Sequence, residues 1–259
     1  MKPNHKIIVI KFFLNNFICN FFIRMLAAEA KIYSKCNPYL DFKPNQSKSM
    51  QENAGYSNRL EINEVIEKSK FDLHNTIKEF CVKESKVLDI GCGPGMYLQL
   101  FQNEQYQLYG TDINILMLNE AKKNAPKAHV IHGDFSKLNF QLKFNFIYCI
   151  GVLIYVPTSG IKNFFQKIYD SLEPNGILYL NYPQAISWLD VIYNDLTYIN
   201  YSPGVIEKLI EPYFKIIKHE QAFDGRKIEV YDKTPYKSLN PLTKRTYKNS
   251  YLLIAQKNT

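Results

Sequence analysis

Short apolar runs alternate with stretches of helical spacing from residue 87 onward. Residues 87–90 form an apolar run interrupted by one acid, as at the end of a buried parallel strand. Residues 107–112 form a second candidate strand, which ends in an acid. Residues 114–123 have helical spacing, and residues 144–150 are almost wholly apolar. Strands that alternate with helices predict an α/β fold built on a parallel sheet.

Apolar positions between residues 56 and 80 recur at helical spacing and predict a helix that leads into the first strand. Residues 130–135 mark the end of a third strand. A Pro-Asn-Gly turn signal at residues 174–176 precedes a further apolar run, which is a candidate fifth strand.

Three glycines, Gly91, Gly93 and Gly95, follow the first predicted strand at every second position. Such a turn lets the backbone approach a ligand closely, because no Cβ stands in the way. The amphipathic stretch at residues 97–101 predicts that the turn opens a helix. A strand, a glycine turn and a helix N-terminus together are typical of a nucleotide site.

The glycine spacing and a nearby acid narrow the choice of ligand. A dinucleotide fingerprint is G-x-G-x-x-G, whereas this turn is G-x-G-x-G with Asp89 two residues before its first glycine. A carboxylate at that place would repel a pyrophosphate and would suit a cationic ligand. These residues resemble motif I of the class I methyltransferases, whose cofactor S-adenosylmethionine has no phosphate and carries a sulfonium and an ammonium.

The resemblance implies a Rossmann-like, seven-stranded, mostly parallel sheet with helices on both faces and an antiparallel last strand. Residues 213–219 and 250–256 would be its sixth and seventh strands. It also implies S-adenosylmethionine as the cofactor. The residues that it places in contact with the cofactor around the glycine turn are Asp89, Gly91, Cys92, Gly93 and Gly95.

Acids at later strand ends extend the resemblance. Asp112, followed by Ile113, would accept both ribose hydroxyls, or it would cap the helix that starts near residue 114. Asp134 would meet the adenine amino group, with Phe135 following by its backbone, although Gly-Asp alone is a turn signal. The loop after the fourth strand would lie under the cofactor and would contribute Ile150 and Gly151.

The segment before the first strand serves related enzymes as a lid over the cofactor. Tyr56 and Arg59 are the candidates in this chain. Arg59 would either meet the methionine carboxylate with two hydrogen bonds or remain an exposed helix cation.

The acceptor is narrowed mainly by exclusion. Enzymes that methylate exocyclic amines of DNA carry an Asn/Asp-Pro-Pro-aromatic tetrapeptide after the fourth strand, and residues 150–153 lack it. The chain also has no Pro-Cys dipeptide, which cytosine-C5 enzymes use as nucleophile. We therefore expect no DNA substrate and favour a small-molecule acceptor such as a sugar, a quinone precursor or a lipid-linked metabolite.

Two alternatives remain, an RNA methyltransferase and a non-catalytic methyltransferase-like partner subunit. Residues 1–50 and 224–259 each hold eight Lys/Arg, against two and three Asp/Glu, whereas residues 51–223 are mildly acidic. The basic tail at residues 226–248 is either a solvated loop or a patch for an anionic acceptor such as RNA. An RNA enzyme would more naturally be basic around its site, which disfavours RNA.

No general base is identified. Tyr155 and His132 are the candidates, and His132 could equally be a packing residue. We expect the acceptor pocket to be formed by the lid, by residues 151–157 and by residues 181–202, which contain a cap insertion near residues 183–202. The aromatic residues there either line the pocket or fill the core of the cap, and they are Tyr182, Trp188, Tyr193, Tyr198 and Tyr201.

The five cysteines form no C-x-x-C pair and the five histidines form no H-x-x-x-H pair, so no metal is implied. The unpaired cysteines and the cofactor favour a reduced, cytoplasmic protein. The oligomeric state is open.

Residues 1–50 are expected to be a basic N-terminal extension, and residues 51–259 the methyltransferase domain. Residues 7–26 are apolar at 15 of 20 positions, and their polar residues form one helical stripe. This helix could lie in a membrane interface, whereas Lys11 disfavours a spanning helix. The alternatives are a secretory signal, because residues 28–30 mimic a cleavage site, and an over-extended reading frame with Met25 or Met50 as the true start.

Overall fold

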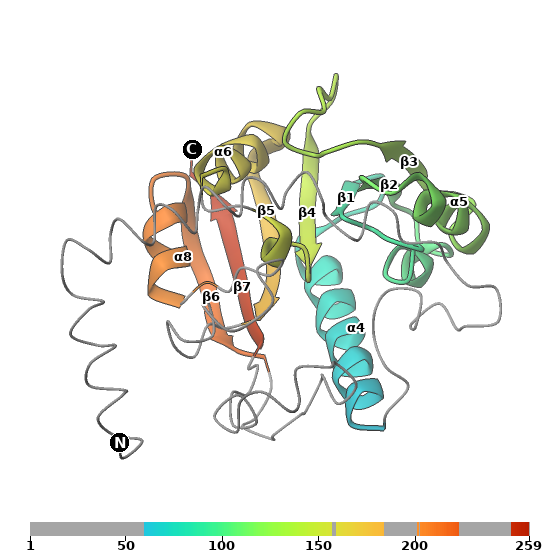
Figure 1. Ribbon diagram of the computed structural model, residues 1–259, viewed down its shortest axis with the longest axis horizontal. Helices are drawn as coiled ribbons and strands as arrows, with labels where there is room; N and C mark the ends of the chain where they lie inside the picture. The colour runs from blue at the N-terminus through green and yellow to red at the C-terminus, as the bar shows by residue number, and fades with distance from the viewer. Residues whose placement is uncertain (1–59, 157–158, 184–200, 202, 223–249, 259) are drawn as a thin grey trace, which may run out of the picture.

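The computed structural model describes residues 60–156, 159–183, 201, 203–222 and 250–258 (Figure 1). Several sequence predictions lie outside these residues and stay predictions. They are the extension at residues 1–50, Tyr56, Arg59, nearly all of the cap with Trp188, Tyr193 and Tyr198, and the basic tail at residues 226–248.

The described strands form one seven-stranded sheet with the order β3-β2-β1-β4-β5-β7-β6. Neighbouring strands from β3 to β5 are parallel, and β7 is antiparallel to both β5 and β6. The predicted mostly parallel sheet with an antiparallel last strand is therefore confirmed. The strands are β1 (Lys86–Ile90), β2 (Gln107–Asp112), β3 (His129–His132), β4 (Phe144–Ile150), β5 (Leu172–Pro183), β6 (Phe214–Gln221) and β7 (Ser250–Lys257).

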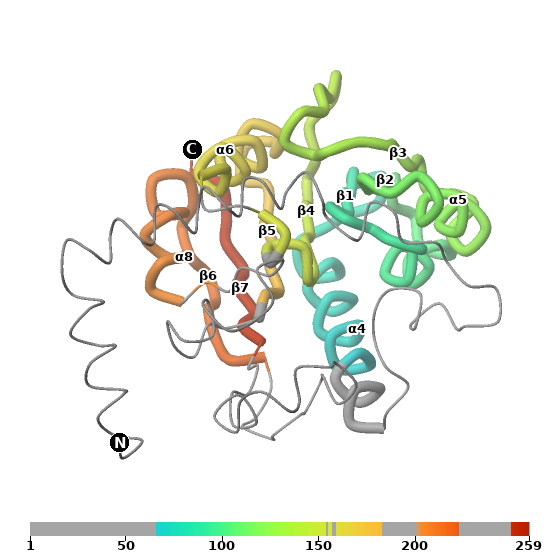
Figure 2. The backbone as a smooth tube through the Cα atoms, in the orientation of Figure 1, coloured from blue at the N-terminus to red at the C-terminus, as the bar shows by residue number. Residues whose placement is uncertain are grey.

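Helices cover both faces of the sheet, as predicted. On one face α4, α5 and the 3-10 helix η1 pack against the sheet, and on the other face α6 and α8 do so. Figure 2 shows α5 beside β3 at one end of the sheet and α8 beside β6 at the other. The helices are α4 (Leu60–Phe80), η1 (Leu98–Phe101), α5 (Ile115–Asn124), η2 (Leu153–Tyr155), α6 (Ile161–Ser171) and α8 (Pro203–Ile210).

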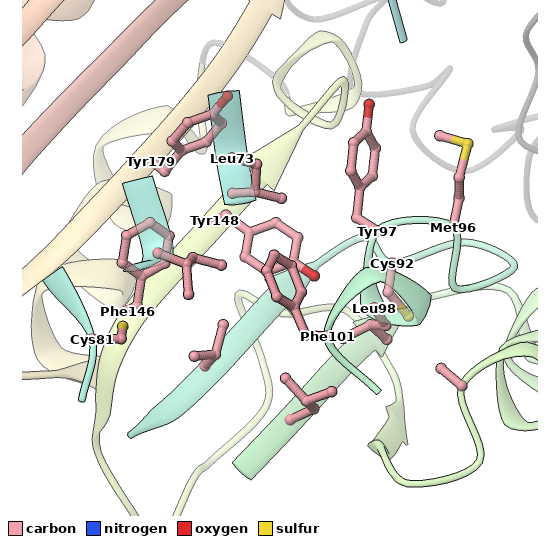
Figure 3. Packing of buried hydrophobic residues seen from close by; sticks show 14 of the residues in the cluster. Leu73, Cys81, Cys92, Met96, Tyr97, Leu98, Phe101, Phe146, Tyr148 and Tyr179 are labelled. Atoms are coloured by element: carbon pink, nitrogen blue, oxygen red, sulfur yellow. The ribbon is translucent and has the colours of Figure 1, made fainter. Parts of the chain in front are cut away.

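Side-chain alternation on β1 explains how the strand serves two cores. Val87 packs into the core under α4, while Leu88 and Ile90 pack into the core under α6 and α8. Because both faces are covered, residues 87–90 are all buried, and the strand reads as an apolar run rather than as an alternating one. Figure 3 shows part of the first core.

The segment after the glycine turn differs from its prediction. Only the short 3-10 helix η1 forms there, not an α-helix opened directly by the turn. Leu98 and Phe101 are fully buried, and in a 3-10 helix residues three apart lie on the same side. This tighter helix therefore anchors the segment to the core within the few residues that precede β2. Among the residues described here, none of the helices has the length and apolar character needed to span a membrane.

Candidate cofactor site

The glycine turn lies at the carboxyl edge of the sheet and is fixed to the end of β2. The Gly91 and Cys92 amides both donate to the Thr111 carbonyl, at 2.7 and 2.9 Å. The Gly93 amide donates to Oδ2 of Asp112 at 2.8 Å. The strand ends of β1 and β2 therefore hold the turn through its backbone.

Glycine is required at two positions of this turn by both conformation and packing. Gly91 has φ +72°, and a Cβ there would lie 2.3 Å from Cγ2 of Val152 in the loop after β4. Gly95 has φ +84°, and its Cβ would lie 3.1 Å from the Cα of Ala121 on α5. L-residues with a side chain rarely adopt such φ values. The turn is thus packed between the loop after β4 and α5.

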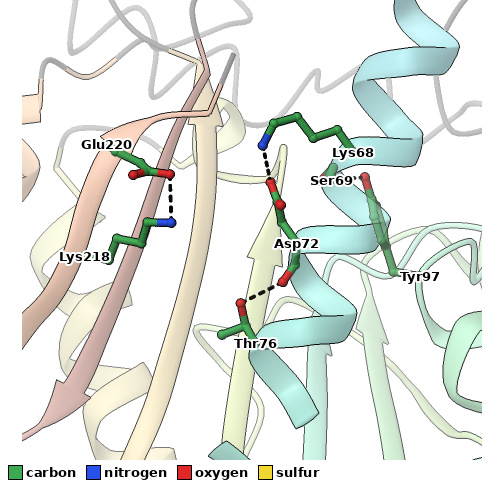
Figure 4. Close-up of polar contacts among 7 residues, drawn as sticks. All are labelled: Lys68, Ser69, Asp72, Thr76, Tyr97, Lys218 and Glu220. Atoms are coloured by element: carbon green, nitrogen blue, oxygen red, sulfur yellow. Dashed lines mark hydrogen bonds and ion pairs between the residues drawn. The ribbon is translucent and has the colours of Figure 1, made fainter. Parts of the chain in front are cut away.

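A hydrogen bond links the turn region to α4. Tyr97, just after the glycines, donates from its hydroxyl to Ser69 Oγ on α4 at 3.4 Å (Figure 4). The helix that leads into the first strand therefore contacts the predicted site from one side.

Asp112 ends β2 and is almost fully buried. Its Oδ1 accepts from the Asn114 amide at 2.8 Å, and Oδ1 of Asn114 in turn caps α5 by accepting from the Leu116 and Met117 amides. The helix cap is therefore Asn114, and Asp112 holds the Asn114 backbone by accepting from its amide. The contact of Asp112 with a ribose stays a prediction.

Asp89 lies under the turn and is 2 % exposed. Within the described part of the chain its Oδ2 has no hydrogen-bond partner, and neither has the buried hydroxyl of Tyr148, its register neighbour on β4. Burial raises the pKa of the Asp89 carboxyl well above its usual range, and the charge of Asp112 raises it further. An unsatisfied buried acceptor is costly, so a bound cation or ammonium would relieve it. These residues therefore fit a ligand with a positive charge.

Cys92 sits inside the turn with a buried thiol (Figure 3). Burial raises its pKa well above the ordinary value, and the charges of Asp89 and Asp112 raise it further. A thiol held protonated in this way is a poor nucleophile. Cys92 can therefore serve the site through its backbone and its packing.

The end of β3 joins the same edge through β2. The Gly133 amide donates to the Asp112 carbonyl at 2.9 Å, and Nε2 of His132 lies 3.0 Å from the Ile113 carbonyl. His132 is exposed at the strand end. Its contact with the Ile113 carbonyl holds the ring beside Asp112, the predicted ribose contact.

Asp134 organises the turn that follows. Its Oδ1 accepts from the Ser136 amide at 3.0 Å and from the Ser136 hydroxyl at 2.7 Å, and Oδ2 pairs with Lys137 at 3.2 Å. Partial burial opposes ionisation, yet these hydrogen bonds and the Lys137 charge hold the pKa of Asp134 below its usual value. Phe135 is buried against two other phenylalanines. Contact of Asp134 with an adenine stays a prediction.

The loop after β4 completes the edge. Gly151 has φ +71°, and its amide donates to the Asn181 carbonyl on β5 at 3.0 Å. Tyr155 lies in η2, and the carbonyl of Val156 accepts from the Tyr201 hydroxyl at 2.9 Å. The loop under the expected ligand is thus tied to β5 and to the segment before α8.

The described candidates all lie at the carboxyl ends of β1 to β4, where the sequence places them. Open α/β sheets bind ligands outside these ends. The cofactor candidates there are Asp89, Gly91, Cys92, Gly93, Gly95, Asp112, Ile113, Asp134, Phe135, Ile150 and Gly151, with His132 and Tyr155 as candidate bases.

One polar constellation escaped sequence reasoning. The Tyr182 hydroxyl lies 2.8 Å from Nε2 of His219, and Nδ1 of His219 lies 2.6 Å from Oε1 of Glu207. The three residues come from β5, β6 and α8, and no spacing in the sequence signals their meeting. In the part of the chain that the structure describes, no group of three or more His, Cys, Asp or Glu residues is placed to hold a metal ion.

Comparisons with known proteins agree with this geometry. Residues 87–176 match a family model described as a methyltransferase domain. The chain is 29% identical over 141 residues to 18S rRNA (guanine-N(7))-methyltransferase of Bos taurus, covering 49% of this chain and 50% of that protein. It is 27% identical over 141 residues to malonyl-[acyl-carrier protein] O-methyltransferase of Calditerrivibrio nitroreducens, covering 51% and 53%. The chain thus spans about half the length of these curated relatives.

A solved structure resembles the fold over most of this chain. The N-methyltransferase NodS from Bradyrhizobium japonicum, in complex with S-adenosyl-L-homocysteine, matches with a TM-score of 0.59 and 11% identity, covering 81% of this chain and 97% of that one. This chain therefore shares the Rossmann-like fold of that enzyme.

Proposed function

We propose that this chain, whose residues 87–176 match a family model described as a methyltransferase domain, transfers a methyl group from S-adenosylmethionine to a small-molecule acceptor. The observation that carries the proposal is the unsatisfied carboxylate oxygen of Asp89 beneath the glycine turn. A ligand that brings an ammonium and a sulfonium, and no phosphate, matches that carboxylate.

The protein's share of the chemistry is mainly positioning. The bound cofactor supplies a methyl group on sulfur with a good leaving group. The glycine turn admits the ligand close to its backbone, and Asp112 is the residue we assign to the ribose. Alignment of the acceptor with the methyl carbon and exclusion of water then provide most of the acceleration.

The small-molecule acceptor is supported by what residues 150–153 lack. The DNA-amine signature is absent there, and one relative is named for methylating a malonyl-[acyl-carrier protein]. The second candidate is an RNA acceptor, favoured by the relative named for 18S rRNA and by the basic residues 226–248. Binding of RNA through those residues would weaken steeply with added salt.

Labelled S-adenosylmethionine tests the proposal directly. The full chain is incubated with the labelled cofactor and a cell extract, and the label is followed into small-molecule, lipid, RNA and protein fractions. We expect label among small molecules or lipids with the wild-type chain, and none with a Gly91→Ala variant. Gly204→Ala is the matched control, because a Cβ there meets nothing within 4 Å. Label in the RNA fraction would show that the acceptor is RNA and not a small molecule. Absence of label from every fraction would reject the methyltransferase activity.

A further inference from the structure

We propose that Tyr182, His219 and Glu207 form a proton relay that removes the proton of a hydroxyl-bearing methyl acceptor; the inference rests on the proposed function. The two contacts, 2.8 and 2.6 Å, are both of hydrogen-bond length. A hydroxyl, an imidazole and a carboxylate in this order are the arrangement by which proteins orient a base.

The partners fix the protons in the relay. A carboxylate can only accept, so Nδ1 of His219 carries a proton and donates it to Glu207. When the ring is neutral, Nε2 is therefore the acceptor, and the Tyr182 hydroxyl donates to it. His219 is thus held in the tautomer that can receive a proton from Tyr182.

The relay lies at the same edge of the sheet as the cofactor site. β5 and β6 run in the same direction because each is antiparallel to β7, so Tyr182 and His219 both lie near carboxyl ends. Tyr182 directly follows Asn181, whose carbonyl accepts from the Gly151 amide under the expected cofactor. The backbone therefore connects the relay with the cofactor site through one hydrogen bond.

Tyr182 passes a proton on and does not act as the base itself. Its hydroxyl is buried, and burial, followed by the charges of Glu207 and Tyr251, raises its pKa above the ordinary value. A free phenolate is thus disfavoured, and Tyr182 can accept a proton only while it gives its own to His219. The Glu207 carboxylate stabilises the imidazolium that results.

The transfer balances without a further reagent. The acceptor's O–H bond breaks and its proton goes to Tyr182 Oη, while the Tyr182 proton moves to Nε2 of His219. The acceptor oxygen forms a bond to the methyl carbon, and the electron pair of the broken carbon–sulfur bond stays on sulfur. Glu207 is 48% exposed, so the relay can return the proton to water after the reaction.

The charges around the ring leave Glu207 as its main electrostatic partner. Tyr251 on β7 packs edge-on against His219 with the ring centroids 5.5 Å apart. On the imidazole's own strand, Lys218 and Glu220 pair with each other at 2.8 Å and so offset their charges (Figure 4).

The first test is His219→Gln, because glutamine can bridge its two neighbours but cannot take up a proton. The assay is methyl transfer from labelled S-adenosylmethionine to the small-molecule fraction that wild type labels, measured across pH. We expect a rate loss of about 10²-fold or more and no fall in rate at low pH, with S-adenosylhomocysteine affinity unchanged. His129→Gln is the control, since His129 is exposed on β3 and stacks on Tyr109.

Two further variants keep the test decisive. Glu207→Gln changes an exposed helix position and should slow transfer, because the carboxylate that orients the His219 ring is lost. Tyr182→Phe should slow it at least as much. Wild-type rates and pH profiles in these variants would overturn the relay while the methyltransferase stands. A wild-type chain that neither transfers methyl groups nor binds S-adenosylhomocysteine would remove the proposed function, and the relay with it.

Discussion

Replacing Gly91 by alanine should destabilise the protein and abolish cofactor binding together. The left-handed φ of +72° costs a residue with a Cβ about 1–2 kcal/mol. The new Cβ would also lie 2.3 Å from Cγ2 of Val152, and overpacking of this kind costs about 1–3 kcal/mol. Val152 cannot easily turn away, because a β-branched side chain has few allowed rotamers. The expected loss in the free energy of unfolding is therefore about 2–5 kcal/mol.

A double-mutant cycle separates the two causes. Val152→Ala removes the atoms that the new Cβ meets, so the pair Gly91→Ala/Val152→Ala should recover about 1–3 kcal/mol and keep the conformational cost. Urea denaturation gives the unfolding free energies, and calorimetry with S-adenosylhomocysteine gives the affinities. Gly204→Ala should be neutral or stabilise by about 0.4–1 kcal/mol. A Gly91→Ala protein within about 0.5 kcal/mol of wild type, with no coupling to Val152, would refute this reasoning.

The other predictions concern acids and a helix cap. Asp89→Asn should stabilise the ligand-free protein and weaken S-adenosylhomocysteine binding. Because burial raises the pKa of Asp89, the stability of the wild type should fall as pH rises above the ordinary carboxyl range. Thermal melts of the Asp89→Asn variant should lack that fall. Asp134 has a lowered pKa, so it stabilises the protein above the ordinary carboxyl range, and this stabilisation should be lost as pH falls through that range. Thermal melts of Asp134→Asn across the same pH series should lack that loss of stability. Asn114→Ala should cost about 0.5–2 kcal/mol in urea denaturation and Asn114→Ser much less, and equal stabilities would show that the cap is dispensable.

The sheet and the glycine turn could be predicted because each has a local cause. β4 is covered on both faces, so its residues form an almost wholly apolar run, and both β2 and β4 have the predicted bounds. Gly91 and Gly95 adopt φ values that residues with a side chain disfavour. Glycine at these two positions of the sequence therefore predicts the turn. The acids at 89, 112 and 134 lie at or just beyond the carboxyl ends of β1, β2 and β3, so parallel topology alone brings them to one edge.

The features that escaped prediction depend on contacts between distant residues. Asn114, rather than Asp112, caps α5, since the choice depends on how the strand end meets the helix. The contact of His219 with Tyr182 exists only because β7 lies between β5 and β6. The unsatisfied pair of Asp89 and Tyr148 likewise depends on the register of β1 against β4. Periodicity in one sequence carries no information on such pairings.

Calorimetric titration of the full chain with S-adenosylhomocysteine tests the central claim most directly. The account predicts binding of one molecule per chain to the wild type and weaker binding to Asp89→Asn. It also predicts that methylthioadenosine, which lacks the ammonium, loses less affinity from that substitution. Absence of heat with both S-adenosylmethionine and S-adenosylhomocysteine, from a chain that melts cooperatively, would contradict it.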